Sequence, residues 1–153
     1  MKKISKILVI SLLALVMVTA LAACGGGAPS YVKNPPATSA ELVTKLEADE
    51  WIVFASEEDE EFGGIAVMAM KIPDISTSAK PTDKITVEMV IVIYFETEEA
   101  AIAAKTEIDN EIKDNMEEML PEGVSLSITV TQKGKTVSAY AKVTVTVGEM
   151  SGM

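Results

Sequence analysis

The chain has 153 residues, no histidine and a formal net charge of −10 at pH 7. All thirteen of its basic residues are lysine, so arginine is absent as well. These absences exclude Ser-His-Asp and Cys-His catalysis, imidazole metal ligands and guanidinium forks that clamp phosphate. The strong negative charge disfavours binding to nucleic acid and to anionic lipid headgroups.

The first 23 residues have the order of an export signal. Three lysines precede an apolar run over residues 7–23 that only Ser11 and Thr19 interrupt. The run is short for a membrane-spanning helix, which needs about 20 apolar residues. The segment that follows, residues 25–29, has no lysine to stop transfer. We therefore expect this leader to be cleaved.

The four residues Leu21-Ala22-Ala23-Cys24 resemble the lipobox of bacterial lipoproteins. The resemblance implies a signal peptide over residues 1–23 and a diacyl lipid, with chains such as palmitate, on the sulfur of Cys24. Two acyl chains on one residue hold a protein stably at a membrane, whereas one chain binds only marginally. The alternative is an ordinary signal peptide cut near Ala22 or Ala23, which would leave an exposed thiol in an exported protein.

Removal of the leader leaves 130 residues, enough for one compact domain. This part has ten lysines against twenty-three acids, a formal charge of −13. Residues 24–37 combine glycine and proline without hydrophobic periodicity, which predicts a lipidated cysteine followed by a flexible tether. Residues 38–150 then form the domain. With Cys24 assigned to lipid, no disulfide is available and packing alone must hold the fold.

The first half of the domain predicts one helix and three strands. Thr38 and Glu41 fit a capping box, so we expect a helix over residues 39–49. Apolar runs predict strands over residues 51–55 and 65–72. A third strand, residues 85–95, has one wholly apolar face, and its other face is polar at the start and apolar at the end. This pattern indicates a central strand that is covered on both sides at its end.

The second half predicts a long helix and a hairpin. Thr97 caps the helix, which ends near Leu120, and Asp109 and Lys113 form a favourable pair on its surface. Its apolar residues recur at helical spacing on one side: Ala101, Ala104, Ile108, Ile112, Met116 and Met119. The hairpin has strands over residues 124–131 and 136–147 around the turn QKGK, with apolar side chains facing inward and hydroxyl side chains outward.

The predicted order is helix, three strands, helix, two strands, which places the chain in the α+β class. We expect a single two-layer domain, with a mixed but mostly antiparallel five-stranded sheet and two helices mainly on one face. The third and fourth strands are joined by the long helix, which permits a parallel crossover. The stretches LVTKLEADEWIV, VIYFETEEAAIAAKTEI and KGKTVS are similar to small cell-surface lipoproteins of Gram-positive bacteria that have no assigned activity.

Two groups of side chains have the chemistry of metal ligands, and each has a simpler interpretation. The acidic residues 57–61 offer oxygens for calcium, but five consecutive acids lack the alternation and the central glycine of a calcium loop. Thioethers suit Cu(I), but methionine is more often a core filler. The methionines concerned are Met68, Met70, Met116, Met119, Met150 and Met153. We expect no metal, no cofactor and no catalytic residue.

Two surfaces are candidates for binding. Val90, Val92, Tyr94 and Tyr140 form a possible interaction surface if they share the outer face of the sheet. The alternative is a half-buried central strand under the first helix. Hydroxyl side chains of the hairpin form a regular face suited to a glycan, although the strand propensity of threonine explains it equally well. They are Ser125, Ser127, Thr129, Thr131, Thr136, Ser138, Thr144 and Thr146.

The function we expect is that of a lipoprotein on the extracytoplasmic face of the cell membrane. Its small acidic domain is a binding or interaction module without catalysis, and its partner is an envelope protein or a glycan rather than nucleic acid. Two alternatives stay open. One is a carboxylate-dependent cell-wall hydrolase with an acid pair such as Glu88 and Glu96. The other is a structural or cation-buffering protein of the envelope.

Overall fold

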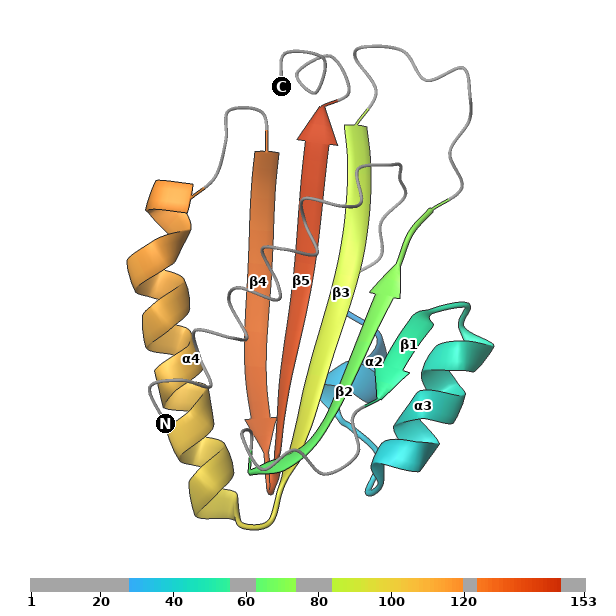
Figure 1. Ribbon diagram of the computed structural model, residues 1–153, viewed down its shortest axis with the longest axis vertical. Coiled ribbons are helices and arrows are strands. Elements are labelled where there is room, and N and C mark those ends of the chain that lie inside the picture. The colour runs from blue at the N-terminus through green and yellow to red at the C-terminus, as the bar shows by residue number, and fades with distance from the viewer. Residues whose placement is uncertain (1–27, 56–62, 74–83, 120–123, 147–153) are drawn as a thin grey trace.

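The computed structural model describes residues 28–55, 63–73, 84–119 and 124–146, the side chains of residues 113–119 excepted. Within these residues, three helices and five strands form an α+β fold (Figure 1). In chain order they are α2 (Ser30–Lys33), α3 (Ser39–Ala48), β1 (Ile52–Ala55), β2 (Gly64–Lys71), β3 (Lys84–Phe95), α4 (Glu98–Met119), β4 (Val124–Lys133) and β5 (Thr136–Thr146). The predicted class, the five strands and the order of the two longer helices are confirmed.

The strands form one sheet in the order β1-β2-β3-β5-β4, and every neighbouring pair is antiparallel. β3 and β4 run parallel to each other but are not paired, because β5 lies between them, so the sheet is antiparallel throughout and not mixed as predicted. The burial of the two hairpin strands explains why β5, and not β4, lies next to β3. β5 is buried on both faces from Val137 to Ala141 and suits the interior of the sheet, whereas β4 exposes every second residue from Ser125 to Thr129 and suits its edge.

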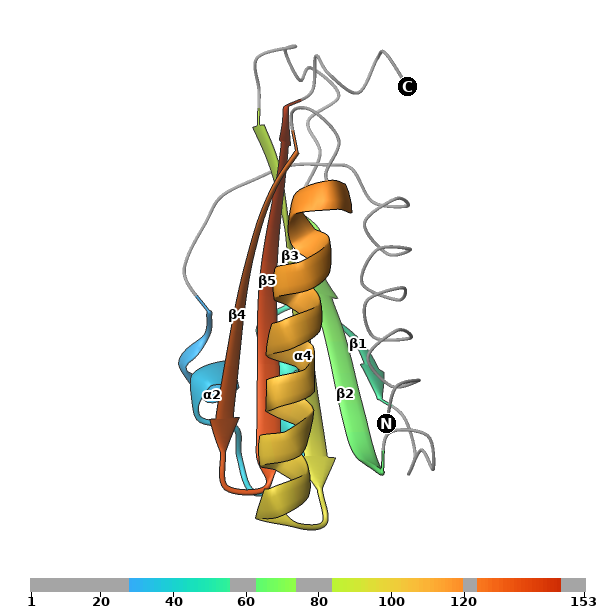
Figure 2. The same ribbon diagram turned by 90° about the vertical axis from the view of Figure 1, so that its left-hand side faces the viewer.

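The helices cover both faces of the sheet rather than mainly one, which differs from the predicted two-layer packing. α4 packs on the face that carries Ile91 and Ile93, called here the α4 face. α2 and α3 pack on the opposite face, which carries Val90 and Val92 and is called here the α3 face. Figure 2 shows α2 and α4 on opposite sides of the sheet. Because β3 is apolar on both faces near its end, burial of Val90 and Val92 requires the additional layer.

The apolar stripe of α4 faces the sheet as predicted. Ala101 and Ile108 are buried in the core of the α4 face, and Ala104 and Ile112 are partly buried against it. The side chains of Met116 and Met119 lie outside the described residues, as does that of Lys113. Asp109 pairs with Lys105, one turn earlier in the helix. Among the described residues, no helix combines the length and the apolar character needed to cross a membrane.

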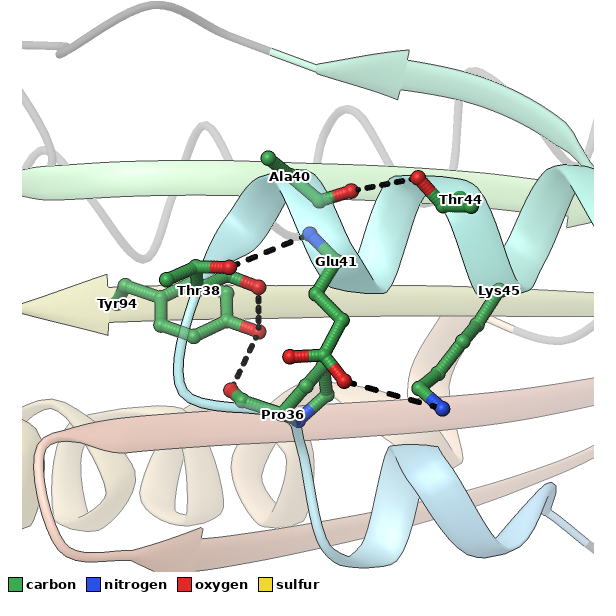
Figure 3. Close-up of polar contacts among 7 residues, drawn as sticks. All are labelled: Pro36, Thr38, Ala40, Glu41, Thr44, Lys45 and Tyr94. Carbon is green, nitrogen blue, oxygen red and sulfur yellow. Dashed lines mark hydrogen bonds and ion pairs between the residues drawn. The ribbon is translucent and has the colours of Figure 1, made fainter.

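The start of α3 is tied to β3 by hydrogen bonds (Figure 3). The N-cap hydroxyl of Thr38 accepts a hydrogen bond from the backbone N–H of Glu41, at 3.3 Å, which confirms the predicted cap. The Tyr94 hydroxyl donates to the carbonyl oxygens of Pro36 and Thr38, at 3.1 and 3.3 Å. These bonds hold the first turn of α3 against the sheet. The exposed pair between Lys45 and Glu41, at 3.9 Å, contributes little.

The segment before α3 is part of the domain, although the sequence predicted a tether up to residue 37. Val32 of α2 is 2 % exposed and packs with Leu42, Leu46 and Trp51. Ala28 is partly buried against the same cluster. The physical reason is that α3 alone does not cover β5, and α2 supplies the missing apolar cover there. Residues 24–27 of the predicted tether, Cys24 included, lie outside the described residues.

Candidate functional site

The four residues predicted as an interaction surface lie in the core of the α3 face. Val90 and Val92 are buried, Tyr140 is 8 % exposed, and Tyr94 is partly buried under α3. They are therefore not free for a partner in the folded domain, and the prediction of a contact surface at these side chains is wrong. The alternative, a central strand covered by the first helix, describes them correctly. The hydroxyl groups of the two tyrosines take part in polar contacts at the border of this core.

Two tyrosines and two carboxylates meet on the α3 face. Tyr140 of β5 donates its hydroxyl proton to Oε1 of Glu88 in β3. Tyr31 of α2 donates to Oδ2 of Asp49, the C-cap residue of α3, at 2.7 Å. The charge of Glu88 also reaches Tyr31, since it contributes to the pKa of that phenol. We call Tyr31, Asp49, Glu88 and Tyr140 the tyrosine–carboxylate cluster.

The sheet register aligns this cluster with a row of polar side chains. Glu88 lies directly opposite Lys71 of β2 on one side and Lys142 of β5 on the other. Lys142 in turn lies opposite Ser127 of β4. Directly opposite residues of antiparallel strands share a face, so these four side chains run side by side across the sheet. We call Lys71, Glu88, Lys142 and Ser127 the polar row.

Lys71 connects the polar row to the cluster. Its Nζ donates a hydrogen bond to the carbonyl oxygen of Asp49, at 2.9 Å. The same atom lies 5.9 Å from the centroid of the Trp51 ring, within the range of a cation–π contact. Because Trp51 is buried, this contact fixes the direction of the lysine side chain along the surface. The end of β2 and the end of α3 are thereby held together.

The polar row lies where the cover of the sheet ends. α2 and α3 lie along the half of β3 that leads to Phe95, and the half that begins at Lys84 extends beyond them (Figure 1). Glu88, Lys71 and Lys142 are accordingly half-buried, and Ser127 is exposed. In the part of the chain that the structure describes, the site is a border between an apolar half of one sheet face, covered by α2 and α3, and a polar half that these helices do not cover. Such borders combine fixed side chains with access from solvent.

Both tyrosines of the cluster are hydrogen-bond donors at neutral pH. Burial raises the pKa of the Tyr140 phenol, and the hydrogen bond to Glu88 and the negative charge of Glu88 raise it further. Burial also raises the pKa of Tyr31, with the hydrogen bond to Asp49 and its charge as the next causes. A hydrogen bond with Trp51 acts in the opposite direction on Tyr31. The phenols therefore keep their protons at neutral pH.

The carboxylate pair named for a hydrolase does not come together. Glu88 lies within β3 and Glu96 follows its end, eight residues later on an extended chain. At about 3.3 Å per residue the two are about 26 Å apart. Glycoside hydrolysis by two carboxyl groups requires a separation of about 5 to 10 Å. Glu88 and Glu96 cannot act on the same bond.

The candidate metal ligands are placed only in part. Met68 and Met70 point to the α4 face, where Met70 is buried in a core of Val87, Met89 and Ala141. The acidic residues 57–61, Met150 and Met153 lie outside the described residues, as do the side chains of Met116 and Met119. Within the described part of the chain, no three acidic or cysteine side chains gather closely enough to hold a metal ion.

The hydroxyl face is shorter than predicted. Ser125, Ser127 and Thr129 of β4 are exposed on the α3 face. Ser138 of β5 is 2 % exposed, because it lies in the covered half of that face. Near the open end, the hydroxyl groups of Thr86 and Thr144 are 3.0 Å apart and hydrogen-bond to each other. Exposed hydroxyl groups therefore adjoin the polar row along β4 and do not continue under α2.

Sequence reasoning missed Tyr31 and Asp49. Tyr31 lies in the predicted tether, and the signal that places it in the domain is the apolar pair Tyr31-Val32 between two prolines. Asp49 is a helix end whose partner lies 18 residues earlier, and no local pattern indicates that contact. Comparison with known proteins adds no assignment, since no protein-family model, curated protein or solved structure matches this chain.

Proposed function

We propose that this protein is a lipoprotein of the extracytoplasmic membrane surface, anchored through Cys24, whose domain binds an envelope protein at the polar row without catalysis. The single observation that carries the anchor is the order of three lysines, an apolar run and Leu21-Ala22-Ala23-Cys24. The binding surface is supported by the tyrosine–carboxylate cluster and the open half of the α3 face. The two parts of the proposal are tested separately below.

The short distance between anchor and domain favours a partner at the membrane. Ala28 already contacts the apolar cluster of the α3 face, and only four peptide units separate it from Cys24. A fully extended chain of that length spans about 14 Å. The same sheet face carries the polar row. A lipid on Cys24 would therefore keep the binding surface close to the bilayer, where the exposed parts of membrane proteins are within reach.

The composition of the surface is typical of a protein interface. Tyr31, which is half-buried beside this surface, combines apolar area with a hydrogen-bonding group and would lose little conformational entropy on binding. Lys71, Glu88 and Lys142 alternate in charge along the row, which favours a partner with the complementary alternation. The separation of Glu88 from Glu96 does not suit a hydrolase that uses this pair of carboxyl groups. A binding role requires neither ionised phenols nor two adjacent carboxylates.

The anchor is tested by mass spectrometry of the protein isolated from its native membrane. We expect the N-terminal peptide to begin at Cys24 and to carry a diacylglyceryl group on sulfur. A Cys24→Ala variant should lose this modification and the stable association of the mature chain with the membrane. A bare thiol at Cys24 in the native protein contradicts the proposed anchor.

The binding surface is tested by photo-crosslinking in intact cells. A photoreactive amino acid in place of Lys142 should give one reproducible adduct with an envelope protein, and the same group in place of Glu99 on α4 should not. Glu88→Gln should weaken the adduct at least fivefold, whereas Glu99→Gln removes the same charge from the other side of the domain and should leave it unchanged. A glycan adduct, or equal crosslinking from both positions, contradicts the proposal.

A further inference from the structure

β4 is a long strand at the edge of the sheet. It spans ten residues and pairs only with β5, so one side of its backbone has no partner among the described residues. The pairing with β5 runs without interruption from Val124 to Lys133, which means that no bulge breaks this edge. Nine consecutive residues, 124–132, carry neither charge nor proline. Unpaired N–H and C=O groups along such an edge form a template for another strand.

The other edge of the sheet is protected. β1 has only four residues, and a very short edge strand offers few backbone groups for pairing. Proteins also protect edges with lysine, proline or a bulge, and β4 has only Lys133 at its last position. The two edges therefore differ, and β4 alone has the length and the neutral surface that strand addition requires.

We propose that β4 pairs with β4 of a second copy of this chain, antiparallel about a twofold axis. The uncharged stretch of residues 124–132 then lies opposite itself, with Ile128 at the axis. In this register Ser127 faces Thr129 of the second copy, and Leu126 faces Val130. Hydroxyl groups thus meet hydroxyl groups on the α3 face, and apolar groups meet apolar groups on the α4 face. A shift by one residue would place polar against apolar side chains on both faces.

Two observations favour a second copy over another partner. Leu126, Ile128 and Val130 belong to the apolar clusters of the α4 face but remain only half-buried, because they lie at its edge. The same three residues of a second copy would cover them. The chain also has a net charge of −10, so most surfaces of two copies repel each other, whereas the edge of β4 is neutral over nine residues. This pairing does not depend on the lipid anchor.

The oligomeric state of the full chain, purified in detergent, tests the proposal. We expect multi-angle light scattering to give the mass of a dimer after subtraction of the detergent. The double variant Ser127→Lys/Thr129→Lys places four like charges around the axis and should be monomeric. Its control, Ala103→Lys/Thr106→Lys, adds the same charge at exposed positions of α4 and should remain dimeric. A monomeric wild-type chain, or a dimer that the β4 lysines leave intact, overturns the proposal.

The register is tested by disulfide formation at the exposed hydroxyl positions. Ser127→Cys/Thr129→Cys should crosslink nearly all dimers under mild oxidation, because each cysteine faces its counterpart in the second copy. Ser127→Cys alone should crosslink at least tenfold more slowly, since position 127 then has no cysteine directly opposite. Equal rates for the single and the double variant overturn the register centred on Ile128.

Discussion

Single residues decide how closely neighbouring parts of the sheet approach. A Cβ atom on Gly64 would lie 2.2 Å from the carbonyl oxygen of Tyr94, so only glycine fits where β2 begins beside the end of β3. The preceding residue, Gly63, has φ +62° in open space and makes the turn into the strand. Tyr94, held at this point, donates the hydrogen bonds that fix the start of α3. The close approach of β2 to β3 and the hydrogen bonds that hold α3 on the sheet are therefore set at the same residue, Tyr94.

Gly64→Ala should lower the free energy of unfolding by about 1–3 kcal/mol, because the added methyl group clashes with the backbone of the neighbouring strand. Urea denaturation measures the change. Gly63→Ala is the matched control, since it has the strain of a positive φ but no clash, and its loss should be smaller. An equal or smaller loss in Gly64→Ala would show that the close approach is not required.

Glu88→Gln should destabilise the protein by about 1 kcal/mol. Tyr140 would then donate to a neutral amide oxygen, and a hydrogen bond to a charged acceptor is worth more than one to a neutral acceptor. The pKa of Tyr140 should also fall, because both the carboxylate charge and the stronger hydrogen bond are lost. Thermal unfolding and ultraviolet titration of the phenols measure the two effects. An unchanged Tyr140 titration would contradict the assigned contact.

Among the elements, α2 shows how a short segment completes a core. It has four residues and no side-chain cap, so its stability comes from packing and not from the helix itself. Val32 is buried among side chains of α3 and the sheet, and Lys33 is exposed. Lys133 Nζ in β4 donates to Oδ1 of Asn34, at 2.7 Å, which joins the end of α2 to the hairpin. α2 therefore positions Tyr31 in the tyrosine–carboxylate cluster.

Val32→Ala should reduce the free energy of unfolding by about 2 kcal/mol, since it removes two methyl groups from a buried site. The neighbouring change Lys33→Ala affects an exposed side chain and should cost less than about 0.5 kcal/mol. Both are measured by urea denaturation. If residues 28–37 were a free tether, the two variants would be equally stable.

At the scale of the molecule, the described residues form three layers: α4, the sheet, and α2 with α3. Among the described residues, α2 and α3 cover one half of the α3 face, and the polar row lies at the border of this cover. The three tyrosines of the chain all lie on this side, and burial is the largest cause of the raised pKa in each of them. For Tyr94 the pKa is raised to about 12, with the charge of Glu41 as a further cause.

The stability of the whole domain should therefore fall at alkaline pH. In the unfolded chain the phenols ionise near pH 10.0, while in the folded domain they hold their protons to higher pH. The unfolded state then binds fewer protons, so the contribution of each tyrosine is complete below pH 10; that of Tyr94 is lost as the pH rises through about 12, and those of Tyr31 and Tyr140 are lost at higher pH. Thermal unfolding between pH 8 and 12 measures this decline. Tyr94→Phe should decline less steeply, and a flat profile for the wild type would contradict the raised values.

Local properties of the sequence specify all the elements that the structure describes except α2, together with their buried faces. The positions of α3, β3, α4 and the β4–β5 hairpin follow from capping residues and from the periods of apolar side chains, which are local properties of the chain. The same local order carries the prediction of a leader and a lipid on Cys24. Periodicity reports that a face is buried, and the apolar end of β3 indicated correctly that both its faces are covered.

Tertiary packing selects which elements cover each face of the sheet and which side chains meet. β5 lies between β3 and β4 because it alone of the hairpin strands is buried on both faces. Tyr31 meets Asp49 across 18 residues, and Tyr140 meets Glu88 across 52. Such contacts depend on strand register and on the layer to which a short helix belongs. No local pattern encodes them, because the energy that selects them comes from burial summed over the whole core.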